Sequence, residues 1–527
     1  DKWWPQVANR LDPYGIYLTQ LDLKSHSPAQ FPDPSGWNDE ACESFNQLFK
    51  KYRERLTALD AYLAETSTQA YDSTLALEAW WTEDTPGLAK DEAELQKRWT
   101  IWWQQKAISL WFEQEADSIV NDKAKFLAAW EALYGEAGQK LRCETAQALN
   151  PLEGLESLLT SLLLDAMANQ FDPHSNYFSL GAAGDFEADL ATAAESFGLE
   201  VSQNEKGEIA IDFLQPGGPA WRSNALNQGD VLLSLRPQGE ALIDLACADP
   251  REVQALLNGN GPREITLKVR KKSGQIKTVK LEVAALTVSE NVVTGFLLEG
   301  ESKLGYLYLP GFYSSFEDNG NYDGLANDVA KELLKLRLKG MEGLILDLRF
   351  NGGGNMYEAI ALSGLFIDEG PVGLWQERGG EPETIKDFYR GLGYDGPLMV
   401  MVNGASASAS EMFAAAMQDY HRAVIVGSPS YGKATSQVVW PLSEQPAFAK
   451  AQGMVKVTGG KFFRPGGGTH QRTGVLPDVI LPDLWQGLIT YEVDEPRAIE
   501  IVATAAARNF TPLAPLPLAE LKAKSQA

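Results

Sequence analysis

Histidine is scarce in this chain: only four of its 527 residues are histidines, and they are His26, His174, His421 and His470. None of them lies in the serine-rich run at 403–411, which is the most distinctive run in the sequence. A Ser/His/Asp hydrolase is therefore poorly supplied with a general base. A Ser/Lys dyad needs no histidine and stays open.

Cysteine and long apolar runs are also in short supply. The three cysteines are far apart and form no Cys-x-x-Cys spacing, so we expect neither a metal site nor a disulfide framework, and no cofactor. They are Cys42, Cys143 and Cys247. No stretch approaches roughly 18 apolar residues, so we expect no membrane span. The opening residues show no leader pattern, which fits a cytosolic protein or an exported one without its signal.

Positive charge is the third shortage. The 46 Lys and Arg residues face 71 Asp and Glu residues, for a net charge of -25 and a pI near 4.7. This balance disfavours nucleic acid or an anionic membrane as the main partner. The 44 % hydrophobic content is enough for substantial cores, and the length predicts roughly three or four domains.

The N-terminal third is predicted to be helical. Apolar residues recur at helical intervals in two stripes, and a leucine-rich helix follows Pro151 and ends before the Asp172-Pro turn. The stripes are Phe45, Leu48, Tyr52, Leu56 and Leu59, and then Leu95, Trp99, Trp102 and Lys106. At these spacings we interpret the tryptophans as core residues and not as a ligand box. They include Trp80, Trp81, Trp102, Trp103 and Trp111.

The pattern of apolar residues changes twice in the remaining sequence. Short β-like runs fill 185–285, interrupted by one helix at 250–257, and from 303 onward β runs alternate with helical patterns. This alternation predicts an α/β layer fold with buried strands. We expect domains at 1–180, 185–285 and 286–485, and a tail at 486–527 with a short helix near 495–508.

Ser408 stands where a predicted strand ends and a predicted helix begins. Free backbone N–H groups at such a junction suit acyl transfer, because they stabilise the oxyanion of a tetrahedral intermediate. Ala409 N–H is one candidate donor, and the glycine triplet supplies the second, for which we prefer Gly354 to Gly353. The alternative reading is structural, since Ser408-Ala-Ser-Glu411 also fits a helix capping box.

Lys433 is the candidate base, in a turn between two apolar strands. Lowering its pKa from about 10.4 to about 7 requires roughly 4 to 5 kcal/mol of destabilisation of the ammonium, and therefore a dry pocket. Gln437 has the same strand parity and is placed to orient the amine. Asp419 lies three helical turns after Ser408 and either supports the site or pairs with Arg422. A surface lysine and glutamine remain the alternative.

Several motifs, taken in order, resemble the carboxy-terminal processing, or tail-specific, proteases of peptidase family S41. They are Gly305-Tyr-Leu-Tyr-Leu-Pro-Gly-Phe312, Asp347-Leu-Arg-Phe-Asn-Gly-Gly-Gly354, Ser406-Ala-Ser-Ala-Ser-Glu411, Gln418-Asp-Tyr-His-Arg-Ala423, Tyr431-Gly-Lys433 and Gly474-Val-Leu-Pro-Asp478. The family resemblance implies that Ser408 is the nucleophile, Lys433 the base and Gln437 its partner. It implies an oxyanion hole at Ala409 and Gly354, with Asp419 as a further functional residue.

The resemblance also implies a fold and a way of binding the substrate. It implies a crotonase-like α/β protease core, an N-terminal helical domain and an inserted PDZ domain at 185–285. The loop around Phe197, Gly198 and Leu199 then binds the carboxylate of a substrate tail on backbone N–H groups. Tyr431 and Ala434 depart from the family pattern, in which Phe and Gly are common.

We therefore predict a serine endopeptidase that binds proteins by their C-termini and cleaves near them, with protein or peptide substrates and an adaptor as the expected partners. The resemblance suggests the bacterial periplasm or cell envelope, with a plastid lumen second. The rival hypothesis is a PDZ adaptor that binds peptides without cleaving them, or cleaves only with a partner. An acyl-CoA enzyme of crotonase fold is a more distant alternative.

Overall fold

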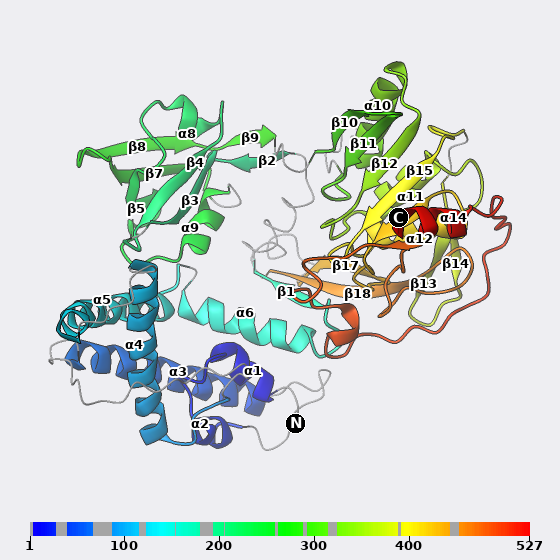
Figure 1. Cartoon of the computed structure of the whole chain (residues 1–527). Helices are drawn as coiled ribbons and strands as arrows, with labels where there is room; N and C mark the ends of the chain where they lie inside the picture. The colour runs from blue at the N-terminus through cyan, green and yellow to red at the C-terminus, as the bar shows by residue number, and fades with distance from the viewer. Residues whose placement is uncertain are drawn as a thin grey trace. The chain divides into compact units, whose positions relative to one another are not determined.

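A computed structural model describes most of the chain, and two compact units make it up (Figure 1). The described residues are 4–27, 39–66, 87–114, 123–152, 154–179, 193–204, 206–258, 262–287, 292–314, 324–387, 391–442 and 453–526. The first unit contains residues 1–167 and 196–284, and the second contains 168–195 and 285–527. Helices and strands occur in both, so the mixed α/β class is confirmed.

The N-terminal part of the first unit is helical, as predicted. Its helices are α1 (Trp4–Leu11), α2 (Gln20–Ser25), α3 (Asp39–Thr66), α4 (Glu92–Gln114), α5 (Lys123–Leu149) and α6 (Leu155–Ala168). The first stripe is confirmed, because it forms the buried face of α3. On α4, Trp99 and Trp103 are buried, while Trp102 and Trp111 are partly buried against the same core. Trp80 and Trp81 lie outside the described residues.

The second part of the first unit is a small β-rich layer with its own core. Its elements are β3 (Leu199–Gln203), β4 (Ile209–Leu214), α8 (Pro219–Arg222), β5 (Val231–Pro237), β6 (Ile243–Asp244), α9 (Pro250–Leu257), β7 (Glu264–Arg270) and β8 (Ile276–Glu282). The strands form one antiparallel sheet in the order β3-β4-β5-β7-β8, with β6 on β5. Strands β2 (Ala193–Ser196) and β9 (Ala284–Thr287), at either end of this segment, pair with each other.

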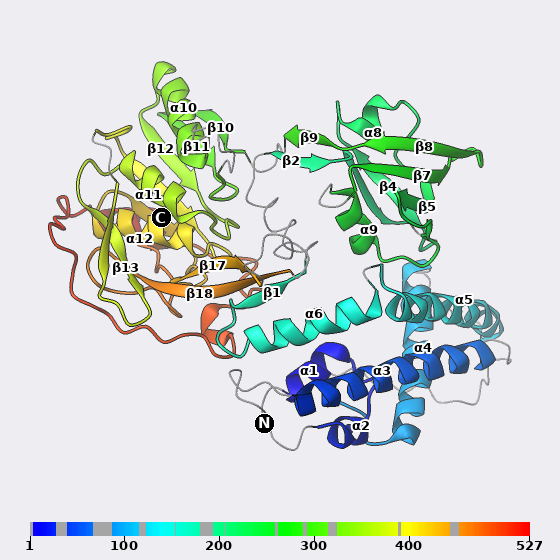
Figure 2. The same ribbon diagram turned by 180° about the vertical axis from the view of Figure 1, so that it is seen from behind.

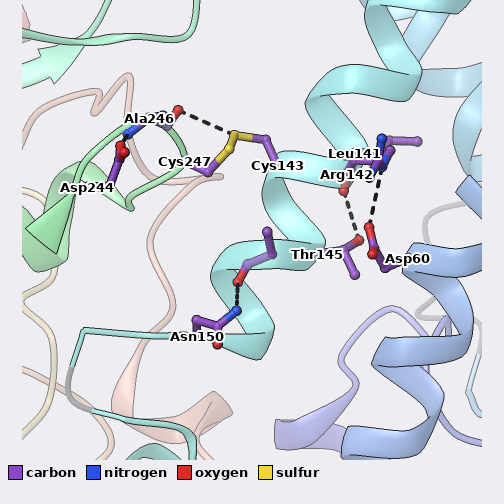
Figure 3. The surroundings of a disulfide bond; sticks show 10 residues. Asp60, Leu141, Arg142, Cys143, Thr145, Asn150, Asp244, Ala246 and Cys247 are labelled. Carbon is purple, nitrogen blue, oxygen red and sulfur yellow. Dashed lines mark hydrogen bonds and ion pairs between the residues drawn. A yellow bond between two sulfur atoms is a disulfide. The ribbon is translucent and has the colours of Figure 1, made fainter. Parts of the chain in front are cut away.

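A disulfide joins the two parts of the first unit, and the expectation of no disulfide was wrong. Cys143 on α5 is bonded to Cys247, just after β6, and Figure 3 shows the bond between the helix and the β6 loop. The two residues are 104 positions apart in sequence, but their Cα atoms are only 5.1 Å apart. Sequence spacing could not reveal this pair, because the fold brings two separate segments together. Cys42 is exposed and takes no part in this disulfide.

A six-stranded sheet forms the centre of the second unit. Its strands, in spatial order, are β10 (Thr294–Glu299), β11 (Lys303–Tyr308), β12 (Gly343–Asp347), β15 (Leu398–Val402), β16 (Val424–Gly427) and β19 (Val479–Ile480). All neighbours are parallel except β10 and β11. The crossover helices are α10 (Leu325–Leu338), α11 (Met356–Gly364) and α12 (Ala409–Asp419). The predicted alternation of strands and helices is thus confirmed.

A second, antiparallel sheet completes this unit. It contains β1 (Asn176–Phe178), β13 (Pro371–Glu377), β14 (Glu383–Lys386), β17 (Thr435–Pro441) and β18 (Met454–Phe463). Figure 1 and Figure 2 show α12 between the six-stranded sheet and this second sheet, and α12 contacts both β16 and β13. Its residues are buried from Ala409 to Met417. Helix α12, which begins directly after Ser408, therefore lies between the two sheets.

The C-terminal tail differs from the prediction. A short 3-10 helix, η3, spans Glu492–Asp494, and the tail's α-helix is α14 (Leu518–Gln526), so the helix expected near 495–508 was wrong. In that segment the N–H groups of Thr504 and Ala507 donate to the carbonyls of Gly467 and Pro465, respectively. These bonds hold the segment against the turn at 465–467. Ile501 and Phe510 pack on Leu374 and Phe463, and these long-range contacts replace the helical ones.

Helix α14 borders an apolar cavity of about 1280 Å³ beside the six-stranded sheet. None of the predicted site residues lines this cavity. Among the described helices, none combines the length and the apolarity that a membrane crossing requires.

Candidate active site

Ser408 occupies a strained turn directly before α12. Its φ is 57° and its ψ is -113°, a combination that is rare for a residue with a side chain, whereas helix caps normally take extended values. A conformation of this kind costs of order 1–3 kcal/mol and is typical of the tight strand-to-helix turns that present nucleophiles. The residue is half-buried and not sealed in the core.

Glu411 connects the serine turn with the lysine turn. Its carboxylate is fully buried, and the backbone N–H groups of Ser408 and Lys433 both donate to Oε2 at 2.8 Å. The two backbone nitrogens therefore lie no further apart than twice that distance. Oε1 accepts from Ser430 Oγ at 2.6 Å and from Gly432 N at 2.7 Å. Burial raises the pKa of Glu411 to about 7, although these hydrogen bonds oppose the shift.

The capping-box pattern predicted as the alternative for Ser408 is also present. In it Glu411 accepts from the Ser408 N–H, as the third residue of a capping box does. The pattern does not separate the two readings, because the same glutamate also binds the segment that carries Lys433.

The two backbone N–H groups predicted to form an oxyanion hole are those of Ala409 and Gly354. Within the described residues, neither Ala409 N–H nor Gly354 N–H has an acceptor, whereas Gly353 N–H donates to Asn351 Oδ1 at 2.9 Å. Of Gly353 and Gly354, it is therefore Gly354 whose N–H has no acceptor among the described residues, and its part in an oxyanion hole stays a prediction. Asn351 O accepts from Ala407 N at 3.1 Å and from Ser410 Oγ at 2.9 Å, so the two loops are joined.

Gly353 explains why this loop needs glycine. Its φ is +105°, and a Cβ added there would lie 2.9 Å from Ser408 Cβ and 3.1 Å from Ala409 N. Only a residue without a side chain allows the triplet to approach the serine turn this closely. The neighbouring Gly352 has nothing within 4 Å of such a Cβ.

Lys433 lies in a half-buried position between β16 and β17. Burial lowers the pKa of its ammonium from 10.5 to about 8, and Lys456 lowers it further, whereas Glu492, Glu411 and Asp172 oppose the shift. No hydrogen bond or ion pair to Nζ is found within the described residues. At pH 7 about one-tenth of such amines are neutral, which is enough for a general base.

Gln437 belongs to a polar network next to the lysine turn. Its Nε2 donates to Thr435 Oγ1 at 3.0 Å and to Thr458 Oγ1 at 3.1 Å. Thr458 Oγ1 in turn donates to Asp172 Oδ1 at 2.8 Å. The described contacts of Gln437 do not include Lys433, so its role as the partner of the amine stays a prediction.

Asp419 lies at the far end of α12, about 15 Å along the helix from Ser408. Its partner is Arg464 and not Arg422: Arg464 Nε donates to Asp419 Oδ1 at 2.9 Å, and Gly466 N donates to Oδ2 at 3.2 Å. Arg422 is instead buried against the carbonyls of Phe366 and Tyr394. Asp419 thus fixes the turn after β18, and a direct part in the chemistry stays untested.

The loop predicted to bind a substrate tail lies in the first unit, between β2 and β3. Phe197 N–H donates to Leu257 O at 3.2 Å, and Gly198 N–H donates to Ser196 Oγ at 3.0 Å. Leu199, the third residue of the predicted loop, is buried at the start of β3. Two of the donors that a carboxylate would use are therefore engaged by the chain itself.

Gln254 of α9 engages the same edge. Its Oε1 accepts from Val201 N at 2.9 Å, and its Nε2 donates to Leu199 O at 3.3 Å. The side-chain amide of Gln254 is therefore hydrogen-bonded to the N–H of Val201 and the carbonyl of Leu199, which are backbone groups that an added peptide strand would use.

Sequence reasoning missed two further groups of the lysine turn. Glu411 was recognised only as a helix cap, although its four donors organise both turns. The Asp172-Pro-His-Ser175 turn was recognised only as a helix stop. In the structure His174 Nε2 lies 2.6 Å from Glu492 Oε2, beside the lysine turn. A buried carboxylate partner leaves no local signal in sequence, since Glu492 is 318 positions from His174.

Comparison with known proteins agrees with this geometry. Residues 303–481 match peptidase family S41, and residues 1–180 match the tail specific protease N-terminal domain. The chain is 31 % identical over 411 residues to the tail-specific protease of Haemophilus influenzae, covering 76 % of this chain and 56 % of that protein. It is 26 % identical over 383 residues to the carboxy-terminal-processing protease of Bartonella bacilliformis, covering 71 % and 80 %.

Among solved structures, the photosystem II D1 C-terminal processing protease is 23 % identical and covers 72 % of this chain and 93 % of its own, with a TM-score of 0.36. A TM-score at that level does not establish a shared overall arrangement. Both domain matches, together with the Haemophilus and Bartonella relatives, give the assignment. The chain belongs to peptidase family S41, and its Haemophilus and Bartonella relatives are named tail-specific and carboxy-terminal-processing proteases.

Proposed function

We propose that this chain is a serine endopeptidase with a Ser408/Lys433 dyad, which recognises proteins by their C-termini and cleaves near them. The observation that carries the proposal is the shared Glu411 oxygen, which holds the backbone nitrogens of Ser408 and Lys433 together. The strained serine turn and the lowered pKa of Lys433 support it. Because the chain spans 56 % of the Haemophilus relative, its activity is proposed here from its own residues.

The first step is acylation. The neutral Lys433 amine takes the proton of Ser408 Oγ while this oxygen attacks the carbonyl carbon of the scissile peptide. The carbonyl oxygen becomes an oxyanion, and the free N–H groups of Gly354 and Ala409 receive it. One such donor typically contributes about 3 to 4 kcal/mol of barrier reduction.

The second step returns the proton. The Lys433 ammonium protonates the leaving amine as the C–N bond breaks, which releases one product and leaves an ester on Ser408. Water then attacks this ester while Lys433 takes one of its protons. The bond between the acyl carbon and Ser408 Oγ breaks, Lys433 returns the proton to Oγ, and the second product leaves as a carboxylic acid that ionises in water. Glu411 acts as a positioning residue in both steps, and Gln437 is proposed to orient the amine.

We assign substrate selection to a PDZ domain at residues 185–285, and the chemistry to a crotonase-like core at 286–485. Support for the PDZ assignment comes from the antiparallel sheet and from α9 beside the edge of β3. A tail would add to that edge as a strand, with its carboxylate near Phe197, Gly198 and Leu199. We propose proteins with apolar C-termini as substrates.

The proposed location is the bacterial periplasm or cell envelope. The Cys143–Cys247 disulfide supports it, because such bonds persist in oxidising compartments and are rare in the cytosol. An adaptor or activating protein as partner remains part of the proposal.

The test uses the full chain and a disordered polypeptide with either an apolar or a charged C-terminus. We expect cleavage of the apolar-tailed substrate by the parent protein and none by Ser408→Ala, with unchanged circular dichroism. Equal turnover by the Ser408→Ala variant would refute the nucleophile. Binding of the tail without cleavage, by parent and variant alike, would instead favour the peptide-binding adaptor.

A further inference from the structure

The turn after α6 contacts the active site of the second unit at two points. His174 Nε2 lies 2.6 Å from Glu492 Oε2, and His174 N–H donates to Asp172 Oδ1 at 2.9 Å. Asp172 also accepts from Thr458, the hydrogen-bond partner of Gln437. The histidine is therefore tied to a buried acid on one side and to the Gln437 network on the other.

Glu492 is linked by hydrogen bonds to the segment that carries Lys433, on both sides of the lysine. Its own N–H donates to Tyr431 O at 3.1 Å, and its Oε1 accepts from Gln471 Nε2 at 2.6 Å. Gln471 Oε1 accepts from Ala434 N at 2.6 Å, so Tyr431 and Ala434, on either side of Lys433, are both attached to this one acid. The Glu492 side chain is fully buried, so water does not screen its charge.

Among the residues that the structure describes, the charged groups that act on Lys433 come from four segments. They are Lys456 on β18, Glu411 on α12, Asp172 in the turn and Glu492 on η3. Among these acids Glu492 has the largest opposing effect on the lowered pKa of Lys433, and His174 Nε2 is hydrogen-bonded to its carboxylate at 2.6 Å. An imidazole N–H that donates to this carboxylate offsets part of its negative field, so the field that reaches the amine from the pair is weaker than that of Glu492 alone.

We propose that His174 and Glu492 form a positioning pair for the Ser408/Lys433 reaction: they fix the Tyr431–Ala434 segment, and their combined charge decides how readily Lys433 releases its proton. This inference rests on the proposed function, and it adds two residues to which no role has been assigned. Neither residue needs to touch the substrate.

If the pair acts on Lys433, substitutions in it shift the pH profile of kcat/KM, which a merely structural role would not do. Glu492→Gln removes the acid that holds the proton on Lys433, so the acid limb of the pH profile for kcat/KM moves to lower pH. His174→Ala leaves that acid without its partner, so the limb moves to higher pH. We expect each shift to be about half a pH unit or more, in opposite directions.

The experiment measures kcat/KM from pH 6 to pH 10 for the full chain and both variants, with unfolding monitored separately. His421→Ala is the matched control, since this histidine lies after the far end of α12 and bonds Leu513 O. Shifts in the same direction, or lower activity with unmoved limbs, would overturn the inference while leaving the dyad intact. Loss of all acylation in His174→Ala would make the histidine the base and overturn the inference and the dyad together. Absence of cleavage by the parent protein would mean that the proposed function had failed first.

Discussion

Lys433→Met separates the catalytic role of the amine from its energetic effect on the fold. Methionine keeps an unbranched apolar stem of similar length and removes the charge, and no hydrogen bond to Nζ is lost within the described residues. The substitution should abolish hydrolysis, because Ser408 loses its base. It should also stabilise the protein, because a half-buried ammonium has been removed.

The magnitude follows from the pKa of Lys433, which burial lowers from 10.5 to about 8. A shift of this size corresponds to about 3 kcal/mol of destabilisation while the amine is charged in the folded state. The folded pKa lies below the unfolded one, so the full penalty applies below pH 8. It declines between pH 8 and pH 10.5, where the unfolded chain still binds the proton, and it vanishes above that range.

Urea unfolding of parent and variant at pH 7 and pH 10.5 measures this penalty. We expect Lys433→Met to be more stable by about 3 kcal/mol at pH 7 and equal to the parent at pH 10.5, with unchanged m-values. A variant that is less stable at pH 7, or whose advantage does not depend on pH, would refute the claim that the pocket disfavours the charged amine.

Three further substitutions test other parts of the account. Ser408→Gly should abolish cleavage yet stabilise the protein by about 1 kcal/mol, because glycine adopts the positive φ without strain; a destabilised variant in urea titrations would argue against strain. Gly353→Ala should lower kcat/KM about 100-fold by displacing Ser408, whereas Gly352→Ala should keep parental values; equal loss in both would contradict the packing argument. Gln254→Ala frees two backbone groups of β3 and should tighten binding of an apolar-tailed peptide about tenfold in fluorescence titration; weaker binding would show that α9 does not compete with the tail.

The second unit was largely predictable because its elements have strong local signals. Buried parallel strands such as β12 and β15 are continuous apolar runs, and the Ser408 turn is marked by small residues followed by a helical pattern. The mixed α/β class and the order of elements followed from these runs.

Other features depend on contacts between distant segments and had no local signal. The helix expected near 495–508 has suitable periodicity, yet its backbone is bonded to the turn at 465–467. The Cys143–Cys247 bond and the Asp419–Arg464 pair likewise join residues that only the fold brings together. Glu411 was visible as a cap, but its link to Lys433 depends on how the loop after β16 returns to α12.

The central claim is that a neutral Lys433 amine activates Ser408, and the pH dependence of acylation tests it most directly. The measurement is the burst of nitrophenolate from a peptidyl nitrophenyl ester in a single turnover, between pH 6 and pH 10. We predict an acylation rate that rises about tenfold per pH unit and levels off above about pH 8, with no burst in Ser408→Ala. The claim would be contradicted by an acylation rate with its midpoint near pH 6.5 or near pH 10.5, or by a rate that does not change with pH.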